Sequence, residues 1–303
     1  MLIGGFTAPA TSGMFQLKDL VSAGYPVLAL TRRFCTSRAR DVQNCAMDTA
    51  VQLYLKKLVA AARAVLGDNL VGAYAAGSLC LDAYEPGRSD IDVALVCERA
   101  VDTEEKRQLV SRLRHETLRC PARGLELVLY QRGVARSGTP DPGYELEVNT
   151  GSAMPFRATF DPADRPAADG RFWYALDRSI LHQSGLALFG QPAAEVFGDL
   201  GAADLRTALI DALNWWLLLP MPDSEEPAPG AEDAVLGACR SLVKHRDGVW
   251  LAKVAAARHL LSVGQPEPLI EQSIEARHGG PSPSGRQAHA FQQLVRDEIG
   301  GSA

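Results

Sequence analysis

The spacing of apolar residues fits helices in some parts of the chain and strands in others. Apolar residues recur on one helical face from Met47 to Leu66. A second helix is predicted over 102–118, with Asp102 as its N-cap and Glu105 three residues later. Short apolar or alternating runs predict strands at 69–77, 91–97, 124–131 and 144–149. The first half of the chain is therefore predicted to mix helices and strands.

Strand signals stop beyond about residue 168, and only helical patterns continue from there. These patterns lie at about 170–186, 204–218, 232–246, 250–263, 267–277 and 286–299. We therefore predict an α/β (α+β) fold, in which a domain with a mixed β-sheet at 47–165 precedes an all-α helical bundle at 166–303.

Residues 1–46 differ from the rest of the chain, because basic residues outnumber acidic ones there and Gly, Ser, Thr and Pro interrupt the apolar pattern. One interpretation is an extension, or the product of a misplaced start codon, with the working domain beginning near Met47. The alternative is a short extra element that packs on the first domain.

The bulk composition narrows the class of protein. The 303 residues carry a formal charge of -5, which argues against a protein that binds nucleic acid backbones and is compatible with a cationic small molecule. The six cysteines are scattered, as is typical of reduced thiols in a cytoplasmic protein. No apolar run reaches the length of a membrane span, and no secretory signal is recognisable, so we expect no membrane partner. Because the net charge is negative, we also expect no nucleic acid partner.

The candidate chemistry lies in the segment "AAGSLCLDAYEPGRSDIDVALV" (75–96). Asp90 and Asp92 are two residues apart at the start of a predicted strand, so their side chains share one face. Two such carboxylates repel each other unless a cation lies between them, and Mg²⁺ is the usual ion, bound by one or two carboxylates and substrate phosphates. Gly77 lets backbone N–H groups approach a phosphate, and the Ser78 hydroxyl adds a donor.

Glu126 is a third carboxylate, inside the otherwise apolar strand predicted at 124–131. A metal or a catalytic role would account for an acid at such a position. Each of these features alone also has a purely structural explanation: a Gly-Ser turn is common, Asp-x-Asp can be a solvated strand end, and Glu126 can face water. Their combination and order favour a site for a metal-bound nucleoside triphosphate.

This pattern resembles the nucleotidyltransferase superfamily, and more closely its aminoglycoside (3'')(9) adenylyltransferases, which modify streptomycin and spectinomycin. The resemblance covers most of residues 47–280. It rests on the GS…SDID segment, on "GLELVLYQ" (124–131), on "FWYALDRSILHQSGLALFGQPAAEVF" (172–197) and on "VLGACRSLVKHRDGVWLAKVAAARHLL" (235–261). It implies a nucleotidyltransferase domain followed by a helical domain.

The resemblance also implies transfer of AMP from ATP to a hydroxyl, with release of pyrophosphate and with Mg²⁺ held by Asp90 and Asp92. Glu126 would deprotonate the acceptor or share the metal. Ser78 and Ser89 would bind phosphate oxygens. The Arg and Lys that reach the phosphates thirteen residues apart in the family correspond here to Arg240 and Lys253.

The sequence departs from the family on the acceptor side. Gly151 or its neighbours stand where streptomycin-modifying members carry a Trp, and His278 stands where they carry a Tyr. Glu232 and Asp233 are the nearest candidates for the acids that precede the Arg helix. The tryptophans are interpreted as core residues, and four histidines as surface or satisfied polar residues: Trp173, Trp215, Trp216 and Trp250, and His182, His245, His259 and His289.

Two further functions remain open on the sequence. A nucleotidyltransferase of this type could instead modify a protein, an RNA or another small molecule, although the acidic charge argues against RNA. A nucleotide-binding module without catalysis is the other alternative, against which the presence of all three acids counts. We expect a monomer.

Overall fold

The computed structural model describes residues 48–264 and 267–301. Residues 1–47, 265–266 and 302–303 lie outside the described part, and with them the expectation for 1–46. Among the described helices, none is long and apolar enough to cross a membrane.

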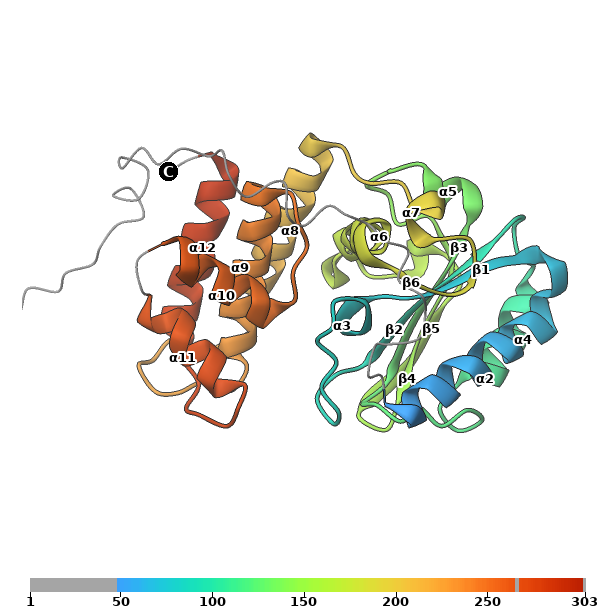
Figure 1. Ribbon diagram of the computed structural model, residues 1–303, viewed down its shortest axis with the longest axis horizontal. Coiled ribbons are helices and arrows are strands. Elements are labelled where there is room, and N and C mark those ends of the chain that lie inside the picture. The colour runs from blue at the N-terminus through green and yellow to red at the C-terminus, as the bar shows by residue number, and fades with distance from the viewer. Residues whose placement is uncertain (1–47, 265–266, 302–303) are drawn as a thin grey trace, which may run out of the picture. The chain divides into compact units, whose positions relative to one another are not determined.

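A six-stranded mixed sheet, in the order β5-β4-β3-β2-β1-β6, forms the centre of the first half (Figure 1). Its strands are β1 (Leu70–Ala75), β2 (Ile91–Cys97), β3 (Leu125–Gln131), β4 (Tyr144–Gly151), β5 (Met154–Thr159) and β6 (Leu186–Gly190). β2 and β3 run parallel, and the other neighbouring pairs are antiparallel. The sequence-based prediction of a mixed sheet is confirmed.

The alternation of side chains along β2 and β3 gives the sheet two covered faces. Ile91, Val93 and Leu95 point into a core beneath α2 (Thr49–Leu66) and α4 (Thr103–Leu113). The intervening positions continue into a second core, built of Ala94, Val96, Tyr130, Tyr144, Tyr174, Leu181 and Phe197, among others. α6 (Phe172–Ser184) covers this second face, opposite α2 and α4 in Figure 1.

A fully buried guanidinium fixes α6 to the sheet half. Arg178 donates hydrogen bonds to the backbone carbonyls of Thr139, Asp141 and Pro142, at 2.7, 2.6 and 2.8 Å. Its Cζ also lies 5.2 Å from the centre of the Tyr130 ring. Because charged groups are rarely buried without such partners, these contacts define the orientation of the helix.

The helix predicted at 102–118 begins as expected and ends early. Asp102 accepts a hydrogen bond from the Glu105 N–H, and the Glu105 side chain accepts one from the Asp102 N–H, which is a complete capping box. The helix ends at Leu113 because the His115 N–H donates to Thr150 Oγ1 (2.9 Å) and not to the carbonyl one turn earlier.

The expectation that strands stop at residue 168 is wrong. β6 comes after α6 and pairs antiparallel with β1 at the edge of the sheet. β5 was also not predicted. Gly77 and Ser78, interpreted as a turn, open the short helix α3 (Gly77–Cys80). The boundary between residues 165 and 166 stays a prediction.

The predicted helical bundle is confirmed as the second part of the fold. Its helices are α8 (Ala202–Leu218), α9 (Ala231–Asp247), α10 (Lys253–Val263), α11 (Pro268–Ala276) and α12 (Gly285–Gly300). The shorter helical segments are η1 (Gly67–Asn69), α5 (Arg132–Arg136), η2 (Pro162–Asp164), η3 (Ala167–Asp169) and α7 (Ala193–Val196). α9 is the central helix and contacts α8, α10, α11 and α12. Its less buried side carries Asp233, Gly237 and Arg240, at helical spacing.

Candidate active site

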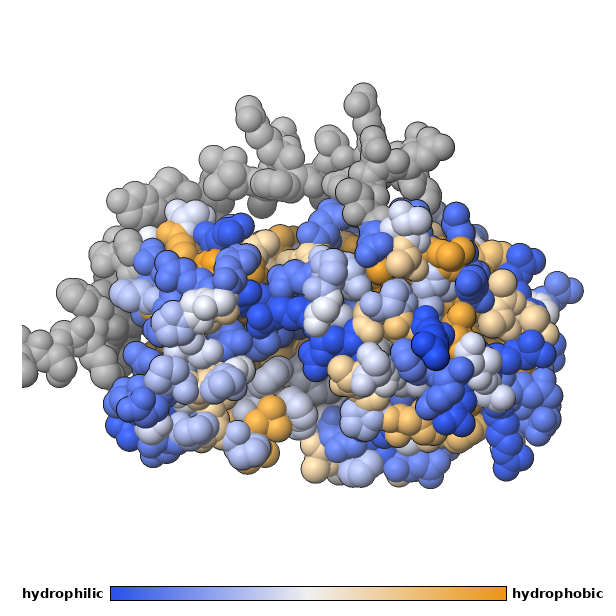
Figure 2. Space-filling view, turned by 90° about the horizontal axis from the view of Figure 1, so that it is seen from below, coloured by the Kyte–Doolittle hydropathy of each residue, from blue (hydrophilic) through white to orange (hydrophobic). Residues whose placement is uncertain are grey.

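A pocket of about 800 Å³ opens above the start of β2 and β3. The sheet, α6, α8, α9 and α10 all contribute to its lining. In Figure 2 hydrophilic side chains border a hollow on the face shown. The lining includes every residue that the sequence assigned to the site: Gly77, Ser78, Ser89, Asp90, Asp92, Glu126, Arg240 and Lys253. Their roles stay predictions, but their proximity is a property of the fold.

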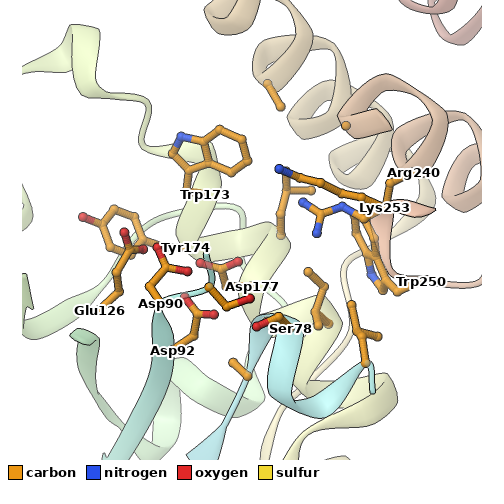
Figure 3. A pocket seen from close by; sticks show the side chains of 18 of the residues that line it. Ser78, Asp90, Asp92, Glu126, Trp173, Tyr174, Asp177, Arg240, Trp250 and Lys253 are labelled. Carbon is orange, nitrogen blue, oxygen red and sulfur yellow. The ribbon is translucent and has the colours of Figure 1, made fainter. Parts of the chain in front are cut away.

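Strand register brings the three predicted carboxylates together. Asp92 lies directly opposite Glu126 in the parallel β2–β3 pair, so the two side chains share the face that α6 covers. Asp90 precedes β2 by one residue and projects to the same side (Figure 3). The sequence predicted that Asp90 and Asp92 share a face, but the pairing with Glu126 depends on the register.

Asp177 is a fourth carboxylate in this group, and the sequence analysis missed it. It belongs to α6, is exposed to the pocket and points toward Asp90 and Asp92 (Figure 3). Trp173 lies four residues earlier, so both side chains are on one face of the helix. An acid on the same face as a Trp of a largely apolar helix was the signal available in the sequence.

The clustering of acids perturbs their ionisation. Removal from bulk water, together with the charges of Asp90 and Asp177, raises the pKa of Glu126 to about 7. Desolvation, followed by repulsion from Glu126 and Asp90, raises the pKa of Asp92 well above its usual value. Desolvation also raises the pKa of Asp177 to about 6, against the opposing effect of Arg240. Such clustered shifts are characteristic of functional sites and are relieved by a bound cation.

Gly77 is required by its contact with Asp92. Its φ of +54° disfavours other residues, and a Cβ at this position would lie 1.8 Å from Asp92 Oδ2. The preceding residue, Ala76, donates its N–H to the Asp92 carbonyl at 2.9 Å. The start of α3 is thus held directly against the acidic end of β2.

The two serines differ in their environment. Ser78 Oγ is buried and has no hydrogen-bond partner in the described part of the chain, as expected of a group that awaits a ligand. Ser89 Oγ accepts a hydrogen bond from the Glu85 N–H at 3.0 Å and so closes the loop before β2. The Ser89 proton remains available as a donor, but the hydroxyl already has a structural role.

Arg240 and Lys253 approach from the helical part, opposite the carboxylates (Figure 3). Among the described residues the Arg240 guanidinium forms no ion pair or hydrogen bond, and its Cζ lies 5.9 Å from the centre of the Trp250 ring. Lys253 Nζ contacts Asp233 Oδ1 at 3.1 Å. Burial lowers the pKa of both side chains, which favours a bound anion beside them.

The interpretation of the tryptophans as core residues is confirmed for Trp250, whereas Trp173 and Trp216 pack against the same core and Trp215 does not belong to it. Trp250 is 3% exposed, whereas Trp173, Trp215 and Trp216 are half-buried, and all four line the pocket. Trp215 packs edge-on against both others, with ring centres 5.7 and 5.5 Å apart. Helical periodicity marks an apolar face but cannot show whether that face meets a core or a pocket.

Three departures from the family pattern have clear positions. Gly151 lies outside the pocket lining, and a Cβ there would come within 2.3 Å of the Arg123 carbonyl oxygen and the Gly124 Cα, so no larger side chain fits. His278 also lies outside the lining. Of the two acids ahead of Arg240, Asp233 lines the pocket, whereas Glu232 is buried behind it.

The prediction that four histidines are surface or satisfied polar residues is confirmed for His182, His245 and His259 and wrong for His289, and all four lie outside the pocket lining. His182 Nδ1 lies 2.7 Å from the Phe197 carbonyl oxygen, and His259 Nε2 lies 2.8 Å from Asp247 Oδ2. His245 is exposed, whereas His289 is half-buried and its Nε2 has no partner among the described residues.

No group of three or more His, Cys, Asp or Glu side chains among the described residues has the arrangement of a metal site. Mg²⁺ does not require such a group, because it retains waters and uses one or two carboxylates with substrate phosphates. Asp90 and Asp92 supply oxygen donors of the right kind on one face. The donor chemistry therefore fits Mg²⁺, with substrate oxygens as the further ligands.

Comparison with known proteins identifies the fold. No family model matches the sequence, and no curated protein matches it either. Among solved structures, the spectinomycin adenyltransferase AAD(9) from Enterococcus faecalis, crystallised with ATP and spectinomycin, is similar with a TM-score of 0.55 and 15% sequence identity. The match covers 82% of this chain and 98% of that one. This likeness, over both the sheet and the helical part, shows that the chain shares the fold of that structure.

Proposed function

We propose that the protein is a Mg²⁺-dependent nucleotidyltransferase that transfers AMP from ATP to a hydroxyl of an aminoglycoside or aminocyclitol, such as streptomycin or spectinomycin, and releases pyrophosphate. One observation carries the proposal: carboxylates at the ends of two paired strands face two cations from the helical part across a single pocket. The fold that the chain shares with an adenyltransferase supports it.

In this proposal the triphosphate lies between the two charged groups. Asp90 and Asp92 would hold Mg²⁺, and the ion would supply positive charge against the phosphates. Ser78 donates to a phosphate oxygen, which would satisfy its unpartnered hydroxyl. Arg240 and Lys253 bind the phosphates from the other side, Arg240 with its planar fork and Lys253 as a point charge.

Glu126 is the proposed general base. Its carboxylate lies on the pocket face opposite Asp92, and a cation bound beside these acids favours the ionised form that can accept a proton from a hydroxyl. Its position opposite Asp92 also allows it to share the metal. A Glu126→Gln variant distinguishes the two roles. If it binds Mg²⁺-ATP normally but does not catalyse transfer, Glu126 is the general base. If it loses Mg²⁺-dependent binding of ATP, Glu126 is a metal ligand.

The aromatic side of the pocket is the proposed acceptor site. Trp173 and Trp215 present ring surfaces beside the exposed carboxylate of Asp177. Aromatic faces and a carboxylate together attract an ammonium group. An acceptor that carries amines as well as hydroxyls, as aminocyclitols do, fits this combination.

The first experiment measures pyrophosphate release from ATP by the purified protein, with and without Mg²⁺. Acceptors are streptomycin, spectinomycin and related aminocyclitols, with an acceptor-free control and an Asp92→Asn variant in parallel. We expect Mg²⁺-dependent release with one acceptor class and at least a hundredfold loss in the variant, because mutations that remove charge stabilisation at a reacting phosphate have effects of about this size.

The possible outcomes separate the parts of the proposal. ATP binding without release under any drug would keep the nucleotide site and reject the antibiotic acceptors. Undiminished release by Asp92→Asn would reject the assigned metal site. Failure to bind ATP would reject the proposed function as a whole.

A further inference from the structure

The Asp233 carboxylate binds three cations at once, on the pocket side of α9. Its Oδ1 accepts from Lys253 Nζ at 3.1 Å and from Arg277 Nη1 at 2.7 Å, and its Oδ2 lies 3.3 Å from Arg88 Nη2. Although burial acts to raise it, the charges of Lys253, Arg277 and Arg88 hold the pKa of Asp233 below its ordinary value. The carboxylate is therefore ionised at neutral pH.

The cluster adjoins the proposed nucleotide site. Asp233, Lys253, Arg88 and Arg277 all line the same pocket as the carboxylates. Arg88 precedes Asp90 by two residues, which limits the distance between their Cα atoms to about 7 Å. The Arg277 side chain is 10% exposed, and its buried Nε has no partner among the described residues. This guanidinium thus keeps a donor that the protein itself does not satisfy.

A phosphate bound to Lys253 would conflict with this arrangement. The Lys253 ammonium lies 3.1 Å from Asp233, so a phosphate oxygen on Lys253 would approach a carboxylate of the same charge. The conflict disappears if the phosphate takes the place of the carboxylate. A terminal phosphate offers more acceptor oxygens than a carboxylate and can accept from all three cations.

On the basis of the proposed function, we propose that Arg88 and Arg277 bind the terminal phosphates of ATP together with Lys253, and that Asp233 holds these three cations in the nucleotide-free protein until the triphosphate displaces it. Asp233 then competes with the substrate. Among the described residues Asp233 is the one acid that pairs with all three cations, while Glu85 and Glu232 are further partners of Arg277 and Arg88.

Calorimetric titration with Mg²⁺-ATP tests the competition in the full-length protein. Asp233→Asn keeps the size of the side chain and removes the competing charge, so we expect it to bind ATP about three- to tenfold more tightly. Asp247→Asn is the matched control, because it removes an acidic charge from the same helix, α9, but pairs with His259 outside the pocket lining. We expect this control to change the affinity much less.

A second arm tests the cations. Arg277→Gln and Arg88→Gln should each weaken ATP binding by about tenfold, the usual size for a lost charge-assisted contact, and should leave AMP binding nearly unchanged. Arg286→Gln is the control, since Arg286 pairs with Asp223 and Glu225 on the exposed surface. Thermal unfolding of each variant establishes that it is folded.

Opposite results would overturn the proposal. Weaker ATP binding by a folded Asp233→Asn protein would show that Asp233 organises the site and does not compete. Equal losses for ATP and AMP in Arg277→Gln, or no loss, would place the cations outside the phosphate site. If the wild-type protein binds no ATP, both the proposed function and this inference are rejected. If the wild-type protein binds ATP but a variant gives one of the two results above, only this inference is rejected.

Discussion

Asp177 is held in an environment that disfavours its charge, and this has a consequence for stability. Its pKa is raised from 3.8 to about 6, so the folded protein retains a proton that the unfolded chain releases between these values. The stability of the wild-type protein therefore falls as the pH rises through this window. As the pH falls below 3.8, the carboxyl becomes protonated in both states, and the penalty disappears.

We predict that Asp177→Asn is more stable than wild type at pH 7 and equally stable below pH 4. The full pKa difference corresponds to about 3 kcal/mol. Because the side chain is exposed to water in the pocket, screening reduces the effect, and we expect about 1 kcal/mol. Urea unfolding at pH 7 and at pH 3.5 measures both values. A variant less stable than wild type at pH 7 would contradict the predicted environment.

The same variant should bind the acceptor less well if Asp177 receives its amine. Gain of stability with loss of function is expected where a strained group is retained for binding. If the KM of Asp177→Asn for the acceptor is unchanged, Asp177 does not bind the amine of the acceptor.

At the residue scale the sequence predicted the site only where local periodicity defines geometry. The two-residue spacing places Asp90 and Asp92 on one face in any strand. The position of Glu126 opposite Asp92 depends on the register of β2 and β3, which are separated by a helix in the sequence. The position of Asp177 depends on how α6 packs on the sheet. Neither relation is encoded in a short stretch of sequence.

At the scale of elements, the predictable segments were those with their own start and stop signals. α2 ends at Leu66 with Gly67 as its C-cap, and α4 begins with a capping box. β6 was missed because it is an edge strand in which burial does not alternate: Leu186 to Phe189 are half-buried and Gly190 is exposed. β5 likewise lies at an edge and contains Pro155, which weakens any strand signal.

The capping box of α4 provides a test of stability that is separate from function. We predict that Asp102→Ala destabilises the fold by about 1 kcal/mol, because the N–H of Glu105 loses its acceptor. The midpoint of thermal unfolding should fall by about 2–4 °C in a protein of this size. ATP affinity should not change, since Asp102 lies outside the pocket lining; a changed affinity would reveal an unexpected coupling between α4 and the site.

At the scale of the whole molecule, residues 48–264 and 267–301 by themselves supply three hydrophobic cores and the side chains assigned to the site. We therefore predict that a chain beginning at Met47 folds and binds Mg²⁺-ATP within about twofold of the full-length affinity, a difference well under 1 kcal/mol. Circular dichroism and calorimetry of the shortened protein measure both properties. A shortened chain that fails to fold would favour the alternative, in which residues 1–46 pack on the first domain.

The anchoring of α6 by Arg178 separates two tasks in the pocket. The tryptophan and carboxylate of the proposed acceptor side stand on a helix fixed to the sheet half, whereas Arg240 and Lys253 stand on α9 and α10. Substitutions at Trp173 can therefore alter the choice of acceptor, whereas substitutions at Asp177 also change the charge that acts on Asp92 and Arg240. If the acceptor site is as proposed, substitutions in α6 and α8 change which hydroxyl compound binds, while the residues assigned to Mg²⁺ and ATP on β2, β3, α9 and α10 stay in place.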